Sequence, residues 1–501
     1  MRILYCSSFY PPAFVGGAEL IAHEHAARLR AHRHAVGVFA GAVAHPRGRW
    51  SLTQETYEGL PVWRVGIAQS DFDLKVSAFF DPRIDALFEN VLDAFRPDVI
   101  HMHNLVGLSM GMLSVARRRG LRCFLTVHDH WGFCFKNTLL RPDGRVCTDF
   151  SRCSGCFPTV SDCAGRTYPM RLRRDFVRHQ ARLADGFVSP SYYLACAYVR
   201  AGFPVDKFSV IPYGVAHERF RPKADREPAA RLKVGFVGYL GDHKGVAVLI
   251  EAVARAQRRG ELDVVVAGEG HLQDTLEERV RREGLQHIVR FAGKLDNQDV
   301  RQMHESLDVL VVPSIWPENS PVTIYEAFAG GTAVVASRTG GIPELVHHGV
   351  TGLLFEPGSA AELAAALDRL AGDRGLAERL GRQACNAIRP VSLSSAANQL
   401  ERLYQSAHPA PSGRANERLV IVAADPARAE WKDALARCDA DERFESVRFL
   451  FVDWVDEQTR LEAEWVWAPD VPSVARLAAL GLADKPRIAP DGAALREALA
   501  G

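Results

Sequence analysis

The sequence alternates short apolar, strand-like runs with helix-like segments, and it does so in two successive series. The first series opens with the apolar run 2–7 and the helical pattern 17–33, and it continues through further apolar runs to about residue 189. The second series extends from residue 233 to 370. Continuous apolar strands between helices are typical of parallel sheets that helices cover on both faces. The pattern therefore predicts two doubly wound α/β domains, with ligands at the carboxyl ends of the strands.

The boundaries of these domains follow from polar and Pro/Gly-containing stretches between the periodic segments. A polar loop around residues 221–230 separates the two series, and a Pro/Ser/Gly segment follows the last helical pattern. We predict an N-terminal domain at 1–217, a second domain at 218–387, a crossover helix at 388–408, a linker at 409–416 and a small α/β module at 417–501.

Charge and hydropathy restrict the classes of partner. The chain has 501 residues, with 61 Lys and Arg against 60 Asp and Glu, which gives a formal charge of +1. This balance provides no general attraction for nucleic acid, and we expect none as a partner. No apolar run approaches the ~20 residues that span a bilayer, and the N-terminus lacks the apolar core of a signal peptide. We expect a cytoplasmic protein.

The richest stretch for chemistry is 316–334, which follows the strand predicted to end at residue 312. Ser320 is a good N-cap and Pro321 a good first helical residue, so we predict a helix N-terminus that stabilises a diphosphate. Glu326, in that helix, is placed to accept hydrogen bonds from a ribose diol, and Glu318 precedes the helix. Either carboxylate alone is typical of a solvated surface charge, but the pair around a Ser-Pro cap favours a binding site.

A glycine-rich turn at 235–245 joins another strand to a helix. Gly238 permits close approach of a phosphate to the main chain, and Lys244 adds a compact positive charge. Such turns also occur as plain strand-to-helix connections.

In the first domain, a pair of glycines and a histidine also lie at the ends of predicted strands. Gly16 and Gly17 lie between the first strand and the first helix, where a loop can approach a phosphate. His128 ends a strand at the predicted ligand edge and can bond sugar hydroxyls; a structural histidine is the alternative. His101 and His103 share a strand face, and we interpret them as structural or as lining the cleft.

Glu318 and Glu326 are separated by seven residues, and this stretch resembles the Glu-x7-Glu motif of family 4 retaining glycosyltransferases. The order of landmarks agrees over roughly the first 408 residues. The resemblance implies the GT-B fold, in which two Rossmann-like domains face a cleft. It also implies that Glu326 holds the nucleotide ribose and Glu318 contacts the donor sugar, with Asn319 and Ser320 among the donor-binding residues. The family usually has an arginine where this chain has Tyr239.

The resemblance implies an enzyme that transfers a sugar from a nucleoside-diphosphate sugar to an acceptor hydroxyl and keeps the anomeric configuration. His128, Glu318 and Lys244 are the expected catalytic residues, and no cofactor is required for catalysis. The acceptor is expected to be a glycan or a lipid-linked saccharide in cell-surface polysaccharide or lipid-linked glycan synthesis. Tyr239 leaves a second hypothesis open, a nucleotide-sugar-binding protein without turnover. An NAD-dependent oxidoreductase is a weaker alternative because the G-x-G-x-x-G fingerprint is missing.

A cysteine-rich insertion at 134–163 contains five of the ten cysteines. Short spacings around a central C-x-x-C pair are typical of a structural zinc site or an iron–sulfur cluster, and reduced free thiols are the alternative. The preferred ligands are Cys134, Cys147, Cys153 and Cys156, with Cys163 as a spare.

Six arginines follow the cysteines between residues 166 and 182, with apolar residues interleaved. They can form a basic amphipathic helix on an anionic membrane, which predicts a peripheral contact with the inner face of the cell membrane. A solvated helix face packed on the sheet is the alternative.

Overall fold

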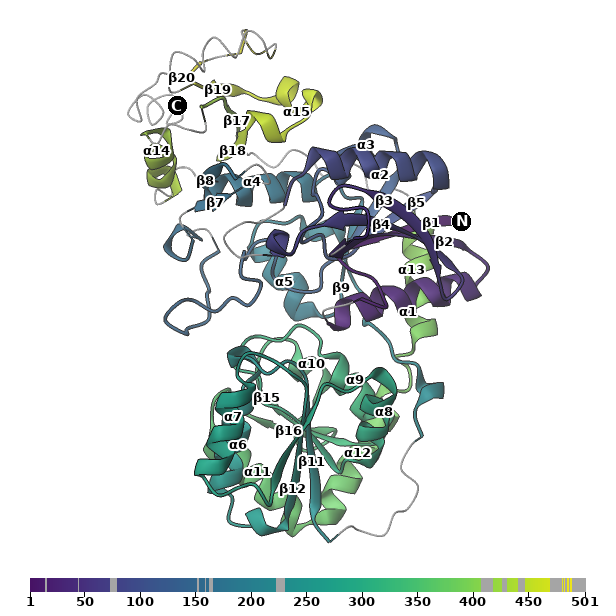
Figure 1. Cartoon of the computed structure of the whole chain (residues 1–501), viewed down its shortest axis with the longest axis vertical. Coiled ribbons are helices and arrows are strands. Elements are labelled where there is room, and N and C mark those ends of the chain that lie inside the picture. The colour runs from purple at the N-terminus through teal and green to yellow at the C-terminus, as the bar shows by residue number, and fades with distance from the viewer. Residues whose placement is uncertain are drawn as a thin grey trace. The chain divides into compact units, whose positions relative to one another are not determined.

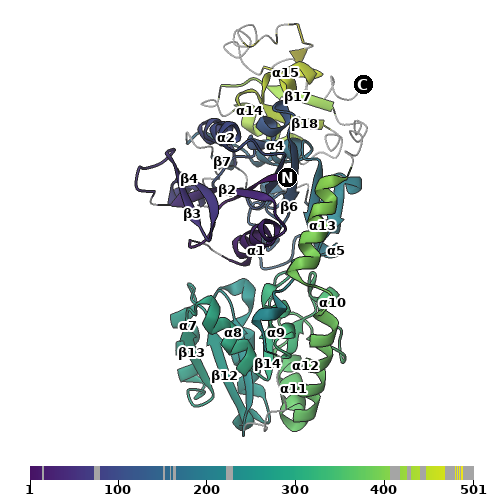
Figure 2. The same ribbon diagram turned by 90° about the vertical axis from the view of Figure 1, so that its right-hand side faces the viewer.

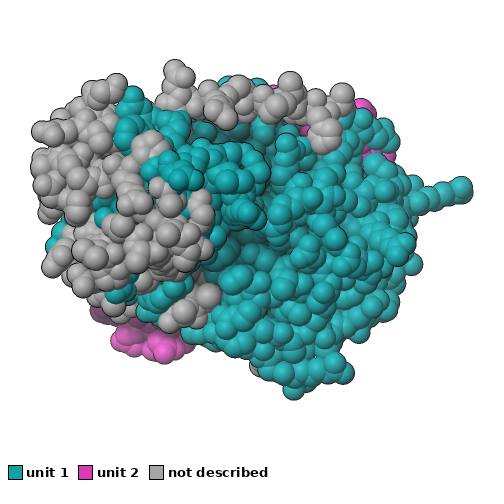
Figure 3. Space-filling model, turned by 90° about the horizontal axis from the view of Figure 1, so that it is seen from above, with its two compact units in different colours: residues 1–189, 195–209, 404–501 teal, residues 190–194, 210–403 magenta. Residues whose placement is uncertain are grey.

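The computed structural model describes residues 1–13, 16–43, 45–72, 79–150, 153–157, 159–161, 165–221, 230–406, 418–425, 430–439, 447–468 and six positions between 480 and 488. The chain forms two compact units (Figures 1 and 3). Unit 1 comprises Met1–Ser189, Ala195–Ser209 and Tyr404–Gly501, and unit 2 comprises Pro190–Leu194 and Val210–Leu403. The C-terminal module therefore belongs to the same unit as the N-terminal domain.

Unit 1 is built on an eight-stranded sheet of order β10-β9-β6-β5-β1-β2-β4-β3. The strands are β1 Arg2–Ser7, β2 Ala35–Val43, β3 Leu52–Tyr57, β4 Leu60–Ile67, β5 Val99–Met102, β6 Arg122–Thr126, β9 Gly186–Ser189 and β10 Phe208–Val210. From β4 across to β9 the pairs are parallel, as the apolar runs predict. The edge strand β3 is antiparallel to β4 and was not predicted, because its exposed polar residues carry no apolar signal.

Five α-helices accompany this sheet: α1 Gly17–Ala31, α2 Pro82–Phe95, α3 Met112–Arg118, α4 Met170–Ala181 and α5 Tyr192–Arg200, whose first three residues belong to unit 2. A small antiparallel pair, β7 Thr159–Ser161 and β8 Thr167–Pro169, precedes α4. Asp81 caps α2 by accepting a hydrogen bond from the Arg83 main-chain N–H at 3.0 Å.

Unit 2 contains a six-stranded parallel sheet of order β13-β12-β11-β14-β15-β16. Its strands are β11 Leu232–Val237, β12 Leu262–Ala267, β13 Val289–Gly293, β14 Val309–Val312, β15 Ala333–Ser337 and β16 Gly352–Phe355. Its helices are α6 Val246–Arg255, α7 Gln273–Arg282, α8 Asn297–Ser306, α9 Val322–Ala329, α10 Ile342–Leu345, α11 Ala360–Gly372, α12 Arg374–Ile388 and most of α13 Leu393–Gln405. Figure 1 shows helices on both sides of the sheet. This is the doubly wound arrangement that the sequence predicts.

Alternate strand residues of unit 2 feed two apolar cores, one on each face of the sheet. Val234 and Phe236 of β11 pack with α6, α7 and α11, whereas Leu310 and Val312 of β14 pack with α8 and α9. Burial on both faces explains why these strands read as continuous apolar runs. The carboxyl ends of β11 and β14, which are neighbours in the sheet, therefore lie at one edge.

The C-terminal module is a four-stranded parallel sheet of order β18-β17-β19-β20. Its elements are β17 Arg418–Val422, α14 Glu430–Asp439, β18 Val447–Phe451, α15 Glu457–Glu462, β19 Trp465–Trp467 and β20 Arg487–Ile488. The linker 409–416 and most of the predicted helix at 472–480 lie outside the described residues. The module packs against α4 of the same unit, as both ribbon views show (Figures 1 and 2).

This packing overturns the expectation that the arginine-rich helix rests on a membrane. Arg171, Arg173 and Arg174 of α4 are all less than one-tenth exposed. The Arg171 guanidinium donates to the Val447 carbonyl of β18 at 2.8 Å, and Asp175 accepts from the Phe449 main-chain N–H at 3.0 Å. A helix covered in this way has no basic face for lipid. Within the described part of the chain, no helix combines the length and apolarity that crossing a bilayer requires.

Candidate functional site

Lys244 and Glu318 form a direct ion pair at the carboxyl edge of the unit 2 sheet. Lys244 follows β11 and Glu318 follows β14, and these two strands are neighbours. The Lys244 Nζ atom donates to Glu318 Oε1 at 2.7 Å. The Glu318 side chain is 7% exposed, whereas that of Lys244 is 25% exposed, so the ammonium group is the member of the pair that solvent or a ligand reaches more easily.

Glu318 is held as a carboxylate. Burial on its own raises the pKa of this group, but the charge of Lys244 and hydrogen bonds from Lys244, Ser314 and Trp316 outweigh burial and leave the pKa below its ordinary value. The Ser314 hydroxyl donates to Glu318 Oε1 at 2.7 Å. Sequence reasoning did not single out Ser314 or Trp316, although their position directly after an apolar strand was the available signal.

The loop that carries Glu318 is fixed by a second loop after β15. The Gly341 main-chain N–H donates to the Glu318 carbonyl at 2.7 Å. Gly340 has a φ of +58°, and a Cβ atom there would lie 2.0 Å from the Glu318 carbonyl oxygen. Only glycine fits this approach, so the Gly-Gly pair positions the acidic loop. Glu344, in the helix that follows this Gly-Gly pair, accepts hydrogen bonds from the main-chain N–H groups of Tyr192 and Tyr193.

The helix after Glu318 begins later than predicted. α9 starts at Val322, with Pro321 in the N-cap position and no side-chain cap. The Ser320 hydroxyl lies 2.8 Å from the Tyr325 hydroxyl instead of capping the helix, so the prediction of a Ser320 cap is wrong. Proline at the cap also keeps the preceding residue out of helical geometry. Asn319 and Ser320 follow Glu318 directly in the sequence, and both are buried.

Glu326 lies on α9 against a buried histidine of α8. Its Oε2 atom is 3.4 Å from His304 Nε2, and the Glu326 side chain is 26% exposed while His304 is fully buried. Glu326 therefore keeps part of its carboxylate accessible. The structure pairs Lys244 with Glu318 directly, and it gives Glu326 a separate partner.

In unit 1, His128 is part of a column of buried rings at the carboxyl edge of the sheet. His128 Nε2 lies 2.8 Å from His103 Nδ1, with the two rings stacked at 5.0 Å. His101 stacks on the other side of His103 at 4.8 Å and bonds the Thr126 hydroxyl at 2.6 Å. Burial lowers the pKa of His128 to about 3 and keeps the pKa of His103 well below its ordinary value, so both imidazoles are neutral near pH 7.

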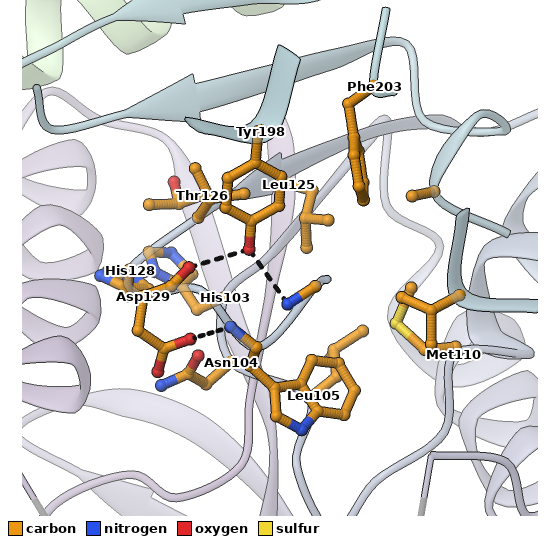
Figure 4. A pocket seen from close by; sticks show the side chains of 15 residues that line it. His103, Asn104, Leu105, Met110, Leu125, Thr126, His128, Asp129, Tyr198 and Phe203 are labelled. Carbon is orange, nitrogen blue, oxygen red and sulfur yellow. Dashed lines mark hydrogen bonds between the residues drawn. The ribbon is translucent and has the colours of Figure 1, made fainter. Parts of the chain in front are cut away.

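A small cavity of about 30 Å³ lies beside this column, lined by His103, His128, Asp129 and Tyr198 among others (Figure 4). The Tyr198 hydroxyl donates to the Asp129 carbonyl at 2.9 Å, and the Asp129 carboxylate accepts from the Trp131 N–H at 2.8 Å. Burial raises the pKa of Asp129 to about 6. The volume suffices for a single water molecule rather than a sugar.

Gly16 and Gly17 stand at the start of α1, also in unit 1. Gly17 is the first residue of α1, and the Gly16 main-chain N–H donates to the buried Glu19 carboxylate at 3.0 Å. The start of α1 thus contains an acidic group as well as the two glycines that the sequence analysis selected. The Glu19 carboxylate satisfies the main-chain N–H group of Gly16.

The four preferred cysteines of the insertion line one cavity of about 620 Å³. They are Cys134, Cys147, Cys153 and Cys156, and none of the four is in a disulfide. Cys163 lies outside the described residues. Within the described ranges no three His, Cys, Asp or Glu side chains are grouped closely enough to hold a metal ion, so the arrangement gives the predicted zinc no support.

Two protein families match consecutive parts of the chain. Residues 15–219 match the family described as glycosyltransferase family 4, and residues 218–387 match the family described as glycosyl transferases group 1. The Lys244–Glu318 pair lies in the second match, and the His128 column lies in the first.

Similar proteins carry related names. An uncharacterised glycosyltransferase of Methanocaldococcus jannaschii is 25% identical over 75% of this chain and 91% of its own length. A D-inositol 3-phosphate glycosyltransferase of Corynebacterium aurimucosum is 33% identical over 40% of this chain. The amylovoran biosynthesis glycosyltransferase AmsK of Erwinia amylovora is 31% identical over 34% of this chain. The chain spans about half the length of these last two relatives, 52% and 44%.

Solved structures show the same fold. HepE of Anabaena in complex with UDP has a TM-score of 0.59 at 21% identity, and the match covers 81% of this chain and 100% of HepE. Sucrose-phosphate synthase of Thermosynechococcus elongatus has a TM-score of 0.63 at 21% identity and covers 81% of this chain and 98% of its own. The predicted GT-B fold is thereby confirmed. The two family matches and the named relatives show that the chain is a glycosyltransferase.

Proposed function

We propose that the protein transfers a sugar from a nucleoside-diphosphate sugar to an acceptor hydroxyl with retention of the anomeric configuration. The observation that carries the proposal is the Lys244–Glu318 pair, 2.7 Å apart at the carboxyl edge of β11 and β14. That edge is where doubly wound folds bind their ligands. HepE, whose fold this chain shares, has been solved with UDP bound.

In this proposal unit 2 binds the donor. Lys244 stabilises the negative charge that develops on the departing diphosphate, and it does so without a required cofactor. Glu318 orients the ammonium group and contacts the donor sugar, while the partly exposed Glu326 accepts hydrogen bonds from the ribose. Main-chain groups at Gly238, Asn319 and Ser320 complete the donor contacts.

Unit 1 contributes acceptor binding. Besides this acceptor role, two of its parts are expected to contact the donor. His128, neutral and hydrogen-bonded to His103, bonds a hydroxyl of the donor sugar, and the loop at Gly16 and Gly17 approaches the donor phosphate. The acceptor oxygen bonds the anomeric carbon on the face from which the diphosphate leaves. The bond from that carbon to the phosphate oxygen breaks as the glycosidic bond forms, and the proton of the acceptor hydroxyl passes to the departing diphosphate. Retention follows from attack on that face.

We further propose a glycan or lipid-linked saccharide as acceptor, in polysaccharide or lipid-linked glycan synthesis in the cytoplasm. The relative named for amylovoran biosynthesis supports this acceptor class. Membrane contact through α4 is not part of the proposal, because the C-terminal module covers that helix.

The test is a panel of UDP-, GDP- and dTDP-sugars incubated with the purified protein and candidate glycan acceptors. We expect one donor to release free nucleoside diphosphate and to give a product whose anomeric proton coupling matches that of the donor. Glu318→Gln should lower turnover by at least a hundredfold, the order seen when one stabilising group is removed from an active site. Stoichiometric binding without release, with every acceptor, would instead establish the non-catalytic binding protein that Tyr239 leaves open.

As a separate structural feature, we propose that Cys134, Cys147, Cys153 and Cys156 bind zinc or an iron–sulfur cluster. The four thiols line one cavity, and thiolates are the ligands that both groups prefer. Because no three of these side chains are grouped closely enough to hold a metal ion in the described structure, binding would have to draw the thiols together. Elemental analysis of the purified protein should find one zinc, or iron with sulfide, per chain, and Cys153→Ser should remove it. Protein free of metal with all four thiols titratable would contradict this.

A further inference from the structure

Tyr239 occupies the position after the first glycine of the β11 turn, and its ring is open to solvent. It is 48% exposed, which places it among the few large hydrophobic side chains of the described residues that are not covered. Its ring lies at the same sheet edge as Lys244, five residues further along the same turn. An exposed aromatic ring at the ligand-binding edge of a sheet, close to a charged pair, can stack against a planar ligand.

The ring is one member of a continuous array. Tyr239 and His243 are stacked with ring centroids 6.1 Å apart, and His243 meets Trp316 edge-on at 5.3 Å. The Lys244 ammonium lies 5.1 Å from the centroid of the Trp316 ring. The array therefore leads from the exposed Tyr239 to the cation that we assign to the diphosphate.

The position of Tyr239 is fixed by its neighbours. Its hydroxyl lies 3.2 Å from His271 Nδ1, and the Leu240 main-chain N–H donates to the Glu269 carbonyl at 3.0 Å. A Cβ atom on Gly241 would lie 2.8 Å from the Tyr239 ring, so the turn closes tightly against it. A ring fixed before binding loses little conformational entropy when a ligand stacks on it.

The array adds little positive charge. Burial, together with the charge of Lys244, lowers the pKa of His243 to about 4, so this imidazole is neutral near pH 7. Within the turn 238–245, Lys244 is the only Lys or Arg in the sequence. Attraction between a diphosphate and this turn therefore comes from one side-chain cation.

We infer that Tyr239 binds the nucleobase of the donor by stacking, and that this contact replaces the charge of the arginine usual at this position. The inference rests on the proposed donor binding by unit 2. Every base offers a π-face, so the ring contributes affinity for the nucleoside part whichever base the donor carries. Lys244 contributes affinity for the diphosphate part.

Calorimetric binding of UDP, GDP and dTDP, and of their nucleosides uridine, guanosine and thymidine, to the full chain separates the two contributions. We expect Tyr239→Ala to weaken binding of the preferred nucleoside diphosphate by about tenfold and to weaken its nucleoside by a similar factor. Tyr239→Phe, which keeps the ring, should stay within about twofold of the wild type. Lys244→Met should weaken the diphosphate but leave the nucleoside unchanged.

The outcomes are distinguishable. If the wild type binds a nucleoside diphosphate and Tyr239→Ala binds it equally well, the inference is overturned while the proposed function stands. Equal losses in Tyr239→Ala and Tyr239→Phe would assign the contact to the hydroxyl and would also overturn stacking. If the wild type binds none of the three nucleoside diphosphates, the proposed function fails and this inference fails with it. Because Tyr239 is half-exposed, circular dichroism should show unchanged folding in both variants.

Discussion

At the scale of single residues, Glu318 shows how burial and pairing compete. The carboxylate is buried, and it remains ionised because Lys244 and Ser314 both donate to the same oxygen. Removing the cation leaves a buried charge without its partner, whereas removing both charges together does not. We therefore expect substitutions of Lys244 and Glu318 to have non-additive effects on the free energy of unfolding as well as on activity.

We expect Lys244→Met to lower the free energy of unfolding of unit 2 by about 3 kcal/mol at pH 7, the order measured when one member of a buried pair is removed. The double variant Lys244→Met with Glu318→Gln should recover at least half of that loss. Urea unfolding of the wild type, both single variants and the double variant measures the coupling. Because the folded pKa of Glu318 lies below its unfolded value, this contribution is present above about pH 4.5 and is lost as the pH falls through the folded pKa. Additive effects of the two substitutions would contradict direct pairing.

The histidine column predicts a second pH dependence, in unit 1. His101, His103 and His128 stay neutral in the folded chain because burial lowers their pKa values, to about 3 for His128. The unfolded chain protonates each of them below about pH 6.5. Stability that is complete above that pH is therefore lost as the pH falls, by about 1.4 kcal/mol per pH unit for each histidine.

Unfolding of unit 1, followed by hydrogen exchange between pH 7.5 and 5.5, measures this slope. Burial also lowers the pKa of His179 in the same unit, to about 3, so at least four histidines contribute to the slope. The variant His103→Gln should therefore reduce the slope by at most about one quarter while lowering stability at pH 7.5. His32→Gln serves as control, since this residue ends α1 outside the column. A slope that is the same in His103→Gln and the wild type would show that the column is not the source of the pH dependence.

At the scale of elements, α4 and the C-terminal module behave as one packed structure. Trp454, which is 1% exposed, contacts Phe79, Phe176, Tyr168 and Phe451 with ring centroids 4.5 to 5.9 Å apart. These rings come from the N-terminal domain, from β8 and α4, and from the module itself. The interface is therefore an aromatic core rather than a surface contact.

Trp454→Ala should lower the free energy of unfolding of unit 1 by about 3–5 kcal/mol, the range for truncating a buried tryptophan. Leu461→Ala in the same module is the matched control, because Leu461 is 56% exposed and its truncation should cost less than about 0.5 kcal/mol. Thermal unfolding monitored by tryptophan fluorescence provides the measurement. Equal melting temperatures in the two variants would mean that the module does not stabilise the rest of unit 1.

The elements that could be predicted from the sequence are those whose apolar residues pack on both faces. β1 matches its predicted bounds 2–7, because every residue of this run after Arg2 is buried. The strand 52–57 was missed, since an exposed edge strand needs no apolar pattern. The burial of α4 was also missed: Arg171 bonds Val447 of the C-terminal module, a contact 276 residues away in the sequence that no local pattern encodes.

The residues of the candidate site also fall into two groups, those that the sequence predicted and those that it did not. Lys244 and Glu318 were predicted because strand ends of a parallel sheet converge at one edge, and this depends only on topology. Their partner Ser314, the ring array at Tyr239 and the pairing of His103 with His128 depend on side-chain directions after those strands. Spacing along the chain does not determine these directions.

At the scale of the whole molecule, donor binding is expected to stabilise unit 2 selectively. A nucleoside diphosphate at one hundred times its Kd adds about 2.7 kcal/mol to the stability of the unit that binds it. Hydrogen exchange of the full chain with and without the nucleotide should therefore show slower exchange around residues 238–245 and 314–330. The C-terminal module serves as an internal reference and should not change. Slower exchange confined to unit 1 would contradict donor binding by unit 2.

The module also decides how far the chain can be shortened. The two matched families end at residue 387, and Arg122 bonds the carbonyls of Tyr404 and Ser406, so a chain ending at 408 keeps every residue of the proposed site. It nevertheless exposes Tyr168 and Phe176, whose rings contact Trp454, together with Arg171 and Asp175, which bond the main chain of β18. We expect this shortened chain to aggregate on expression, whereas Trp454→Ala in the full chain should remain soluble but less stable. A soluble 1–408 chain with the donor turnover of the full protein would show that α4 needs no cover, and that the module serves another purpose.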